Sequence, residues 1–116
     1  MKHSTSKPTK AESERLSRIA GMFCIACRQE DHYTCAHVEV HHLLSGNKRR
    51  GHMYTIPLCT WHHRGEPNGL GVKWMEVNVG PSLARQSKRF RELYGTDDEL
   101  LEKTNQLLAS SGTKDE

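Results

Sequence analysis

The sequence predicts a small α+β domain that is stabilised by a structural zinc ion. Two pairs of potential metal ligands, Cys24/Cys27 and Cys59/His62, each enclose a two-residue spacer, and this spacing suits adjacent corners of a tetrahedral zinc site. The composition agrees with this interpretation, because only 34% of the 116 residues are hydrophobic and 6% are aromatic. A core this lean is marginal for so short a chain, and a bound metal commonly compensates for it.

Helices are expected on both sides of the metal-binding core. Thr9 and Glu12 form a capping box, which predicts an N-terminal helix that runs toward Gly21. Thr96 and Glu99 form a second capping box and predict a C-terminal helix with one leucine-rich face. The core is therefore expected to be flanked by helices that pack against it.

The chain is expected to form one domain over residues 9–109, between disordered segments at residues 1–8 and 110–116. Its first ten residues are polar and basic, unlike a signal peptide. It has no apolar run of about 18 residues, the length of a membrane span. We therefore expect a cytoplasmic protein with reduced, metal-bound cysteines and no contact with a membrane. A secreted protein with two disulfides is the alternative.

Between the two ligand pairs, the pattern predicts a strand, a loop, a second strand and a helix. Polarity alternates with a period of two over residues 38–44, which indicates a β-strand. A basic loop over residues 45–51 leads to a second strand over residues 53–57, and a short helix is expected over residues 60–64. The glycine-rich residues 65–80 indicate no particular element.

Basic side chains gather in the expected loop and in an amphipathic helix that Gly80, Pro81 and Ser82 are expected to open. The net charge is +3, but the segment from Asp97 to the end carries −4, so the rest of the chain carries +7. DNA or RNA is the partner that such clusters predict, and solvated basic faces are the alternative. The basic residues are Lys48, Arg49, Arg50, Arg85, Lys88, Arg89 and Arg91.

Two sets of residues can supply the structural zinc site. We favour the two spaced pairs together, because they repeat the usual knuckle geometry. A more local finger is the alternative, and it would leave Cys59 free. Its ligands would be Cys24, Cys27, Cys35 and His37.

Three further histidines predict a reactive centre beside the zinc. His41 and His42 are consecutive on a predicted strand, so their side chains point to opposite faces. One division of labour is that His41 binds a metal and His42 acts as a general base, a role that suits a neutral imidazole. His63 follows the zinc ligand His62 directly, and we expect the helix to fix it opposite His41 and His42, across a small cleft from His42.

These residues resemble the HNH (ββα-metal) nucleases, in which a zinc knuckle precedes an acidic-or-histidine plus histidine pair and a Leu-Cys-x-x-Cys-His segment. The resemblance is closer to the Ref-type recombination-enhancement, RecA-dependent nucleases of phages, and it covers roughly residues 22–108. The segments that carry it are Cys24-Ile25-Ala26-Cys27, Glu39-Val40-His41-His42-Leu43-Leu44, Gly51-His52-Met53-Tyr54-Thr55-Ile56-Pro57-Leu58-Cys59, Trp61-His62-His63-Arg64 and Gly80-Pro81-Ser82-Leu83-Ala84-Arg85.

The resemblance implies a metal-dependent DNA endonuclease encoded by a phage or prophage and acting as a monomer in a bacterial host. His42 would activate water for attack on a phosphodiester, and His41 and His63 would hold a metal against the scissile phosphate, leaving 5′-phosphate products. The basic residues would contact backbone phosphates without reading sequence. DNA coated by a RecA filament is the implied substrate.

Two positions depart from the family pattern. Tyr54 stands where the family usually has Asn or His, so either His52 takes over that role, by orienting the loop or completing the metal shell, or Tyr54 is a core aromatic. His41 replaces the common Asp, and imidazole suits Zn²⁺, Ni²⁺ or Mn²⁺ better than Mg²⁺. The catalytic ion is expected to be Mg²⁺ or Mn²⁺, with Zn²⁺ as a candidate in the purified protein. Asn68, His52 and His37 are the candidates for a third ligand.

Two other functions fit the same pattern. One is a non-catalytic zinc module that binds DNA, which has no need of His42. The other is a nuclease that cuts branched DNA without RecA.

Overall fold

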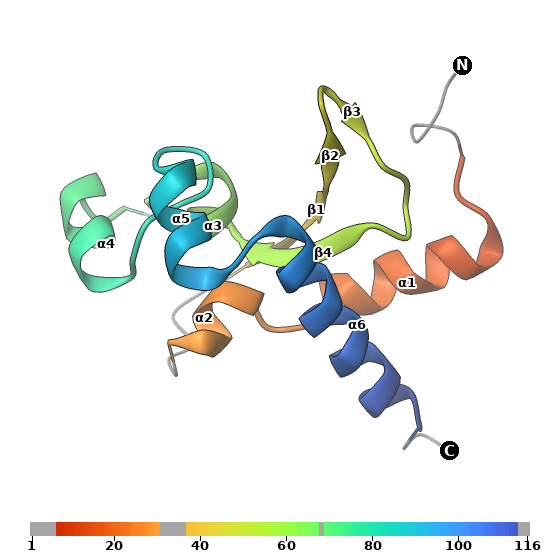
Figure 1. Ribbon diagram of the computed structural model, residues 1–116. Helices are drawn as coiled ribbons and strands as arrows, with labels where there is room; N and C mark the ends of the chain where they lie inside the picture. The colour runs from red at the N-terminus through yellow and green to blue at the C-terminus, as the bar shows by residue number, and fades with distance from the viewer. Residues whose placement is uncertain (1–6, 31–36, 68, 114–116) are drawn as a thin grey trace.

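The structure is a computed structural model that describes residues 7–30, 37–67 and 69–113 (Figure 1). At its centre, strands β1 (Val38–His42) and β4 (Thr55–Cys59) pair antiparallel, with Val38 opposite Cys59 and His42 opposite Thr55. Every residue of β4 is buried, while β1 is half-buried. Both strands were predicted from the sequence, and their pairing forms the ribbon on which the rest of the molecule is built.

The basic segment between these strands is more regular than the expected loop. Strands β2 (Leu44–Ser45) and β3 (Lys48–Arg49) pair antiparallel and form a small hairpin that projects away from the helices (Figure 1). Gly46, with φ of 65°, supplies the left-handed conformation that the tight turn needs. The hairpin therefore presents its basic residues on exposed strands.

Helix α1 (Lys10–Ala20) confirms the first predicted capping box: Thr9 Oγ1 accepts from the amide of Glu12, whose carboxylate accepts from the Thr9 amide. The buried guanidinium of Arg15 donates to Thr55 Oγ1, to the Thr55 carbonyl and to Asn105 Oδ1 over 2.9, 2.7 and 2.8 Å. This side chain therefore joins α1 to β4 and to the C-terminal helix.

Two short helices carry the predicted zinc pairs. Helix α2 (Ile25–Gln29) begins directly after Cys24, and helix α3 (Thr60–Arg64) begins directly after Cys59 at the end of β4. The Cys59 sulfur caps α3 by accepting from the amide of His62 over 3.4 Å. Helix α4 (Val72–Asn78) lies in the glycine-rich segment to which the sequence assigned no element.

The amphipathic helix begins later than predicted. We expected it to open at Gly80-Pro81-Ser82, but α5 spans Ser87–Tyr94. The hydroxyl of Ser82 accepts from the amide of Arg85, and the Leu83 amide donates to the carbonyl of His62 over 2.8 Å. These contacts hold the segment in a turn. The local signal for a helix start was therefore overridden by a tertiary hydrogen bond.

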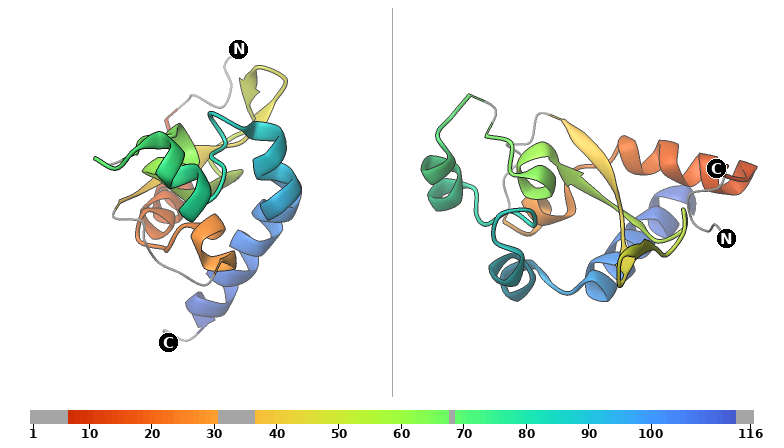
Figure 2. Two further views of the ribbon diagram at one scale, coloured as in Figure 1. Left: turned by 90° about the vertical axis from the view of Figure 1, so that its left-hand side faces the viewer. Right: turned by 90° about the horizontal axis from the view of Figure 1, so that it is seen from above.

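Helix α6 (Asp97–Thr113) confirms the second capping box, since Thr96 and Glu99 exchange the expected hydrogen bonds. It continues past residue 109, where we expected the domain to end. Helices α1, α2, α3 and α6 all pack on the ribbon (Figure 2). Trp61, Phe90 and Leu100 are among the side chains of the buried core. Within the described ranges, no helix is long and apolar enough to cross a membrane.

Candidate functional site

Four buried side chains converge where α2 and α3 meet. Cys24, Cys27, Cys59 and His62 place their ligand atoms within 4.8 Å of one another. His62 Nδ1 lies 3.5, 3.5 and 3.3 Å from the three sulfurs, and the Cys27 and Cys59 sulfurs are 4.0 Å apart. With usual bond lengths, a tetrahedral zinc ion separates nitrogen from sulfur by about 3.6 Å and sulfur from sulfur by about 3.8 Å. The cluster therefore fits a structural zinc site.

Electrostatics also favours a cation at this position. Neighbouring Cys24 and Cys59 sulfurs, with burial, raise the pKa of Cys27 far above its usual range. Burial alone would lower the pKa of His62, but hydrogen bonds to Cys24 and Cys59 outweigh it and raise this pKa to about 10. A divalent cation between the sulfurs would offset the negative charge that these neighbours impose on Cys27.

These four residues are the set that we favoured from the sequence. All three described cysteines are free and buried, so no disulfide joins them. His37, from the alternative local finger, is exposed. Its partner in that alternative, Cys35, lies outside the described residues.

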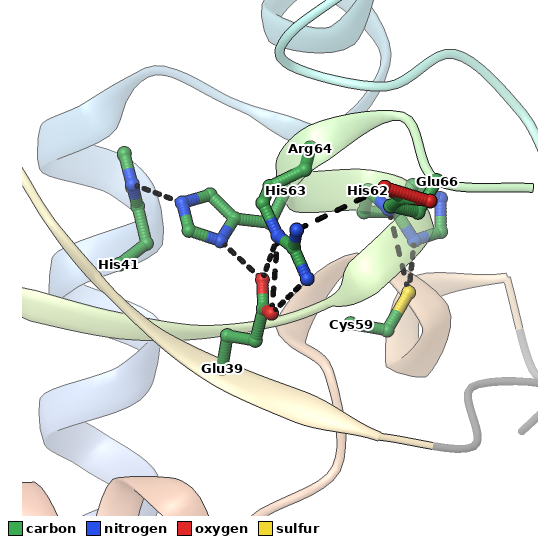
Figure 3. Close-up of polar contacts among 7 residues, drawn as sticks. All are labelled: Glu39, His41, Cys59, His62, His63, Arg64 and Glu66. Carbon is green, nitrogen blue, oxygen red and sulfur yellow. Dashed lines mark hydrogen bonds and ion pairs between the residues drawn. The ribbon is translucent and has the colours of Figure 1, made fainter.

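A second centre lies on the other side of α3, where His41 Nδ1 faces His63 Nε2 over 3.1 Å (Figure 3). His63 Nδ1 donates to Glu39 Oε1 over 2.7 Å, which leaves the Nε2 lone pair directed at His41. Two imidazole nitrogens bound to one metal at about 2.1 Å would lie about 3.0–3.4 Å apart. The pair therefore has the spacing of two metal ligands.

Glu39 was missed as a site residue, although it lies two positions before His41 on β1 and so on the same face. Arg64 donates two hydrogen bonds to the Glu39 carboxylate, from Nε over 3.0 Å and from Nη2 over 2.6 Å (Figure 3). Hydrogen bonding to Arg64 lowers the pKa of Glu39 to about 2, despite partial burial. Glu39 is thus an anchored anion that fixes the tautomer and orientation of His63.

His42 belongs to a separate pair. Its Nε2 lies 3.1 Å from His52 Nδ1, and the two rings meet edge to face. We expected His63 opposite both His41 and His42; the structure brings it to His41 and pairs His42 with His52. Burial, with the charge of Arg49, lowers the pKa of His42 to about 4, and burial with the charge of His63 lowers that of His41 to a similar value. Both imidazoles are therefore neutral at pH 7.

A pocket of about 400 Å³ opens beside His41 and His63, and α5 and the start of α6 close its other side. Arg91 and Asp97 both line this pocket, and Arg91 Nε lies 3.4 Å from Asp97 Oδ1. Sequence reasoning grouped Arg91 with the other basic residues and did not single out Asp97. The lining also includes Ser87 on α5, one helical turn before Arg91.

The remaining basic residues do not share one environment. Lys48, Arg49, Lys88 and Arg89 are exposed. Arg50 Nη1 is paired with Asp98 Oδ1 over 2.8 Å. Arg85 Nε donates to the carbonyl of Gly65 over 2.9 Å at the end of α3. Arg50 and Arg85 therefore have structural partners in addition to their charge.

Of the two positions that depart from the family pattern, His41 belongs to the pair with His63. Tyr54 is 40% exposed, so the alternative that it is a core aromatic is wrong. His52 is buried against His42, which fits the orienting role better than a place in the metal shell. Of the other candidates for a third ligand, His37 is exposed, and Asn68 lies outside the described residues.

A family model described as recombination enhancement, RecA-dependent nuclease matches residues 8–109. The chain belongs to this family. Membership of the RecA-dependent nucleases implies nuclease activity and DNA as a substrate. A search of curated proteins found no match. The match extends from the start of α1 into α6, so the family region includes both clusters and the helices around them.

In this member of the family, consecutive residues of α3 belong to the two different centres. His62 turns toward the cysteines, whereas His63 turns toward Glu39 and His41 (Figure 3). Neighbouring positions on a helix point about 100° apart. A zinc ion on His62 would therefore fix the direction in which His63 leaves the helix.

Proposed function

We propose that the chain is an HNH-type, metal-dependent DNA endonuclease that acts on RecA-coated DNA. The observation that carries this proposal is the approach of His41 Nδ1 to His63 Nε2 at 3.1 Å, with Glu39 behind His63 and a pocket in front. A structural zinc site alone does not need this second centre. The presence of the second centre therefore favours a hydrolytic enzyme over a non-catalytic zinc module.

His41 and His63 would hold a divalent cation, either Mg²⁺ or Mn²⁺, with Zn²⁺ as the candidate in purified protein. Such an ion supplies positive charge to the scissile phosphate and to the leaving 3′ oxygen. Arg91 lines the same pocket and would contact a phosphate there. Further phosphates of the DNA backbone would be bound from α5 and from the hairpin. The exposed residues that would bind them are Lys88 and Arg89 on α5 and Lys48 and Arg49 on the hairpin.

His42 would act as the general base. If its Nε2–H donates to His52 Nδ1, its Nδ1 lone pair is left to take a proton from water. His52 would therefore hold His42 in one tautomer and orientation. Tyr54, which is exposed on the segment between His52 and β4, would lie at the edge of this site.

The decisive experiment compares wild type with His42→Ala on RecA-coated, bare and branched DNA, with Mg²⁺ or Mn²⁺ supplied. We expect wild type to cleave the RecA-coated DNA, and His42→Ala to lose cleavage while keeping DNA binding and its zinc. Full cleavage by the variant, or none by wild type on any substrate, contradicts the proposal. Cleavage by wild type of branched DNA without RecA would favour the structure-selective nuclease instead.

A further inference from the structure

A chain of polar groups leads away from the zinc cluster on the side opposite the sulfurs. His62 Nε2 lies 3.2 Å from Tyr94 Oη, and Tyr94 Oη donates to Glu30 Oε2 over 2.8 Å. Tyr94, the last residue of α5, is only 2% exposed. The three residues come from α3, α5 and the end of α2, so the chain crosses three separate segments.

The positions of the protons give this chain a direction. His62 presents Nδ1 to the three sulfurs, and a ligand nitrogen must be bare, so Nε2 carries the hydrogen. Tyr94 Oη then accepts from Nε2 and has one proton of its own to donate. An ionised carboxylate such as that of Glu30 can only accept. The Val79 carbonyl also lies 3.2 Å from the phenol oxygen, but Glu30 Oε2 is nearer at 2.8 Å and charged, so the donors run from His62 to Tyr94 to Glu30.

The Tyr94 oxygen lies directly against the backbone of Gly80. Gly80 has φ of 113°, and a Cβ atom there would lie 2.1 Å from Tyr94 Oη. The indole of Trp61 donates to the carbonyl of Gly80 over 2.8 Å and fixes this loop against α3. A side chain at position 80 would displace the phenol, so glycine is required by close approach as well as by its backbone angle.

We propose that Tyr94 and Glu30 are positioning residues of the zinc site. Neither touches the metal position. Tyr94 holds the imidazole of His62 with Nδ1 toward the sulfurs, and Glu30 holds Tyr94, so the two together slow the loss of zinc. Partners of this kind on metal-bound histidines commonly contribute about 10- to 100-fold in affinity.

The test measures how fast zinc passes from the full-length, zinc-loaded protein to a chromogenic chelator. Tyr94→Phe removes one oxygen and keeps the ring beside Phe90 and His62, whose centroids lie 4.9 and 5.2 Å away. We expect zinc loss roughly 10- to 100-fold faster than in wild type, and a smaller increase in Glu30→Gln. The double variant should be no faster than Tyr94→Phe alone, because Glu30 acts only through Tyr94.

Packing is the competing explanation, and Phe90→Leu is its matched control. This variant loosens the packing against the rings of Tyr94 and His62 but removes none of the hydrogen-bonding groups. Equal acceleration in Phe90→Leu and Tyr94→Phe would overturn the proposal, as would wild-type kinetics in Tyr94→Phe. If Tyr94→Phe fails to fold, Glu30→Gln decides, and a wild-type rate in that variant overturns the proposal. Protein that binds no zinc at all would overturn it without affecting the assignment of the nuclease centre.

Discussion

Replacing Glu39 by glutamine removes the charge that holds His63 and leaves a side chain of nearly the same size. The Glu39–His63 bond is 2.7 Å long, which is typical of a hydrogen bond to a charged group. Such bonds contribute about 1.5–3 kcal/mol, and about 1.4 kcal/mol corresponds to tenfold. We therefore expect Glu39→Gln to weaken metal binding at the His41/His63 centre and slow cleavage by roughly 10- to 100-fold. The amide oxygen of glutamine still accepts a hydrogen bond from His63, so we expect about tenfold slower cleavage for Glu39→Gln and about 100-fold for Glu39→Ala.

The assay measures kcat and KM for cleavage across a Mn²⁺ titration, with DNA affinity measured separately. Glu66 offers the matched control, because it also approaches Arg64, at 3.9 Å, but does not touch His63. Glu66→Gln removes the same charge and should cleave within about twofold of wild type, as surface pairs contribute little. If Glu39→Gln cleaves like wild type, or if both variants slow equally, the carboxylate does not act by orienting His63.

Three further outcomes follow from the described contacts. Cys59→Ser should release one equivalent of zinc and unfold the domain, while Cys35→Ser should keep the metal; metal analysis of both distinguishes the two candidate zinc sites. Arg15→Ala should lower the free energy of unfolding by roughly 2–3 kcal/mol, because it removes hydrogen bonds from a buried cation to two other segments. Urea denaturation in excess zinc measures that loss, and an unchanged midpoint would show that the link between the two terminal helices is dispensable. Lys88→Ala and Arg89→Ala should each weaken DNA binding without sequence preference and reduce the slope of log K against log salt by about 1, so an unchanged slope would exclude either residue from the DNA contact.

Local signals predicted the central part of the fold well. The period-two pattern before Leu44 and the capping boxes at Thr9 and Thr96 report on hydrogen bonds and faces within a few residues, and all three elements are present. The zinc ligands were also predictable, since each pair lies within one tight turn. Chemistry restricts which residue types can complete such a site.

Contacts between distant segments could not be predicted in the same way. The Leu83 amide bonds to the carbonyl of His62, 21 positions earlier, and so delays the start of α5. Which histidine faces which also depends on where α3 lies relative to β1. The alternation of side chains placed His41 and His42 on opposite faces, but it did not show that His63 lies on the face of His41.

Cys59 ends β4, caps α3 and belongs to the zinc cluster, so no linker separates the strand from the helix. One inserted residue after Cys59 would turn every later side chain of α3 by about 100°. It would carry His62 away from the sulfurs and His63 away from His41 at once. The β2–β3 turn at Gly46 has no such constraint. Related chains are therefore expected to vary in length at this turn while keeping the same count between Cys59 and His63.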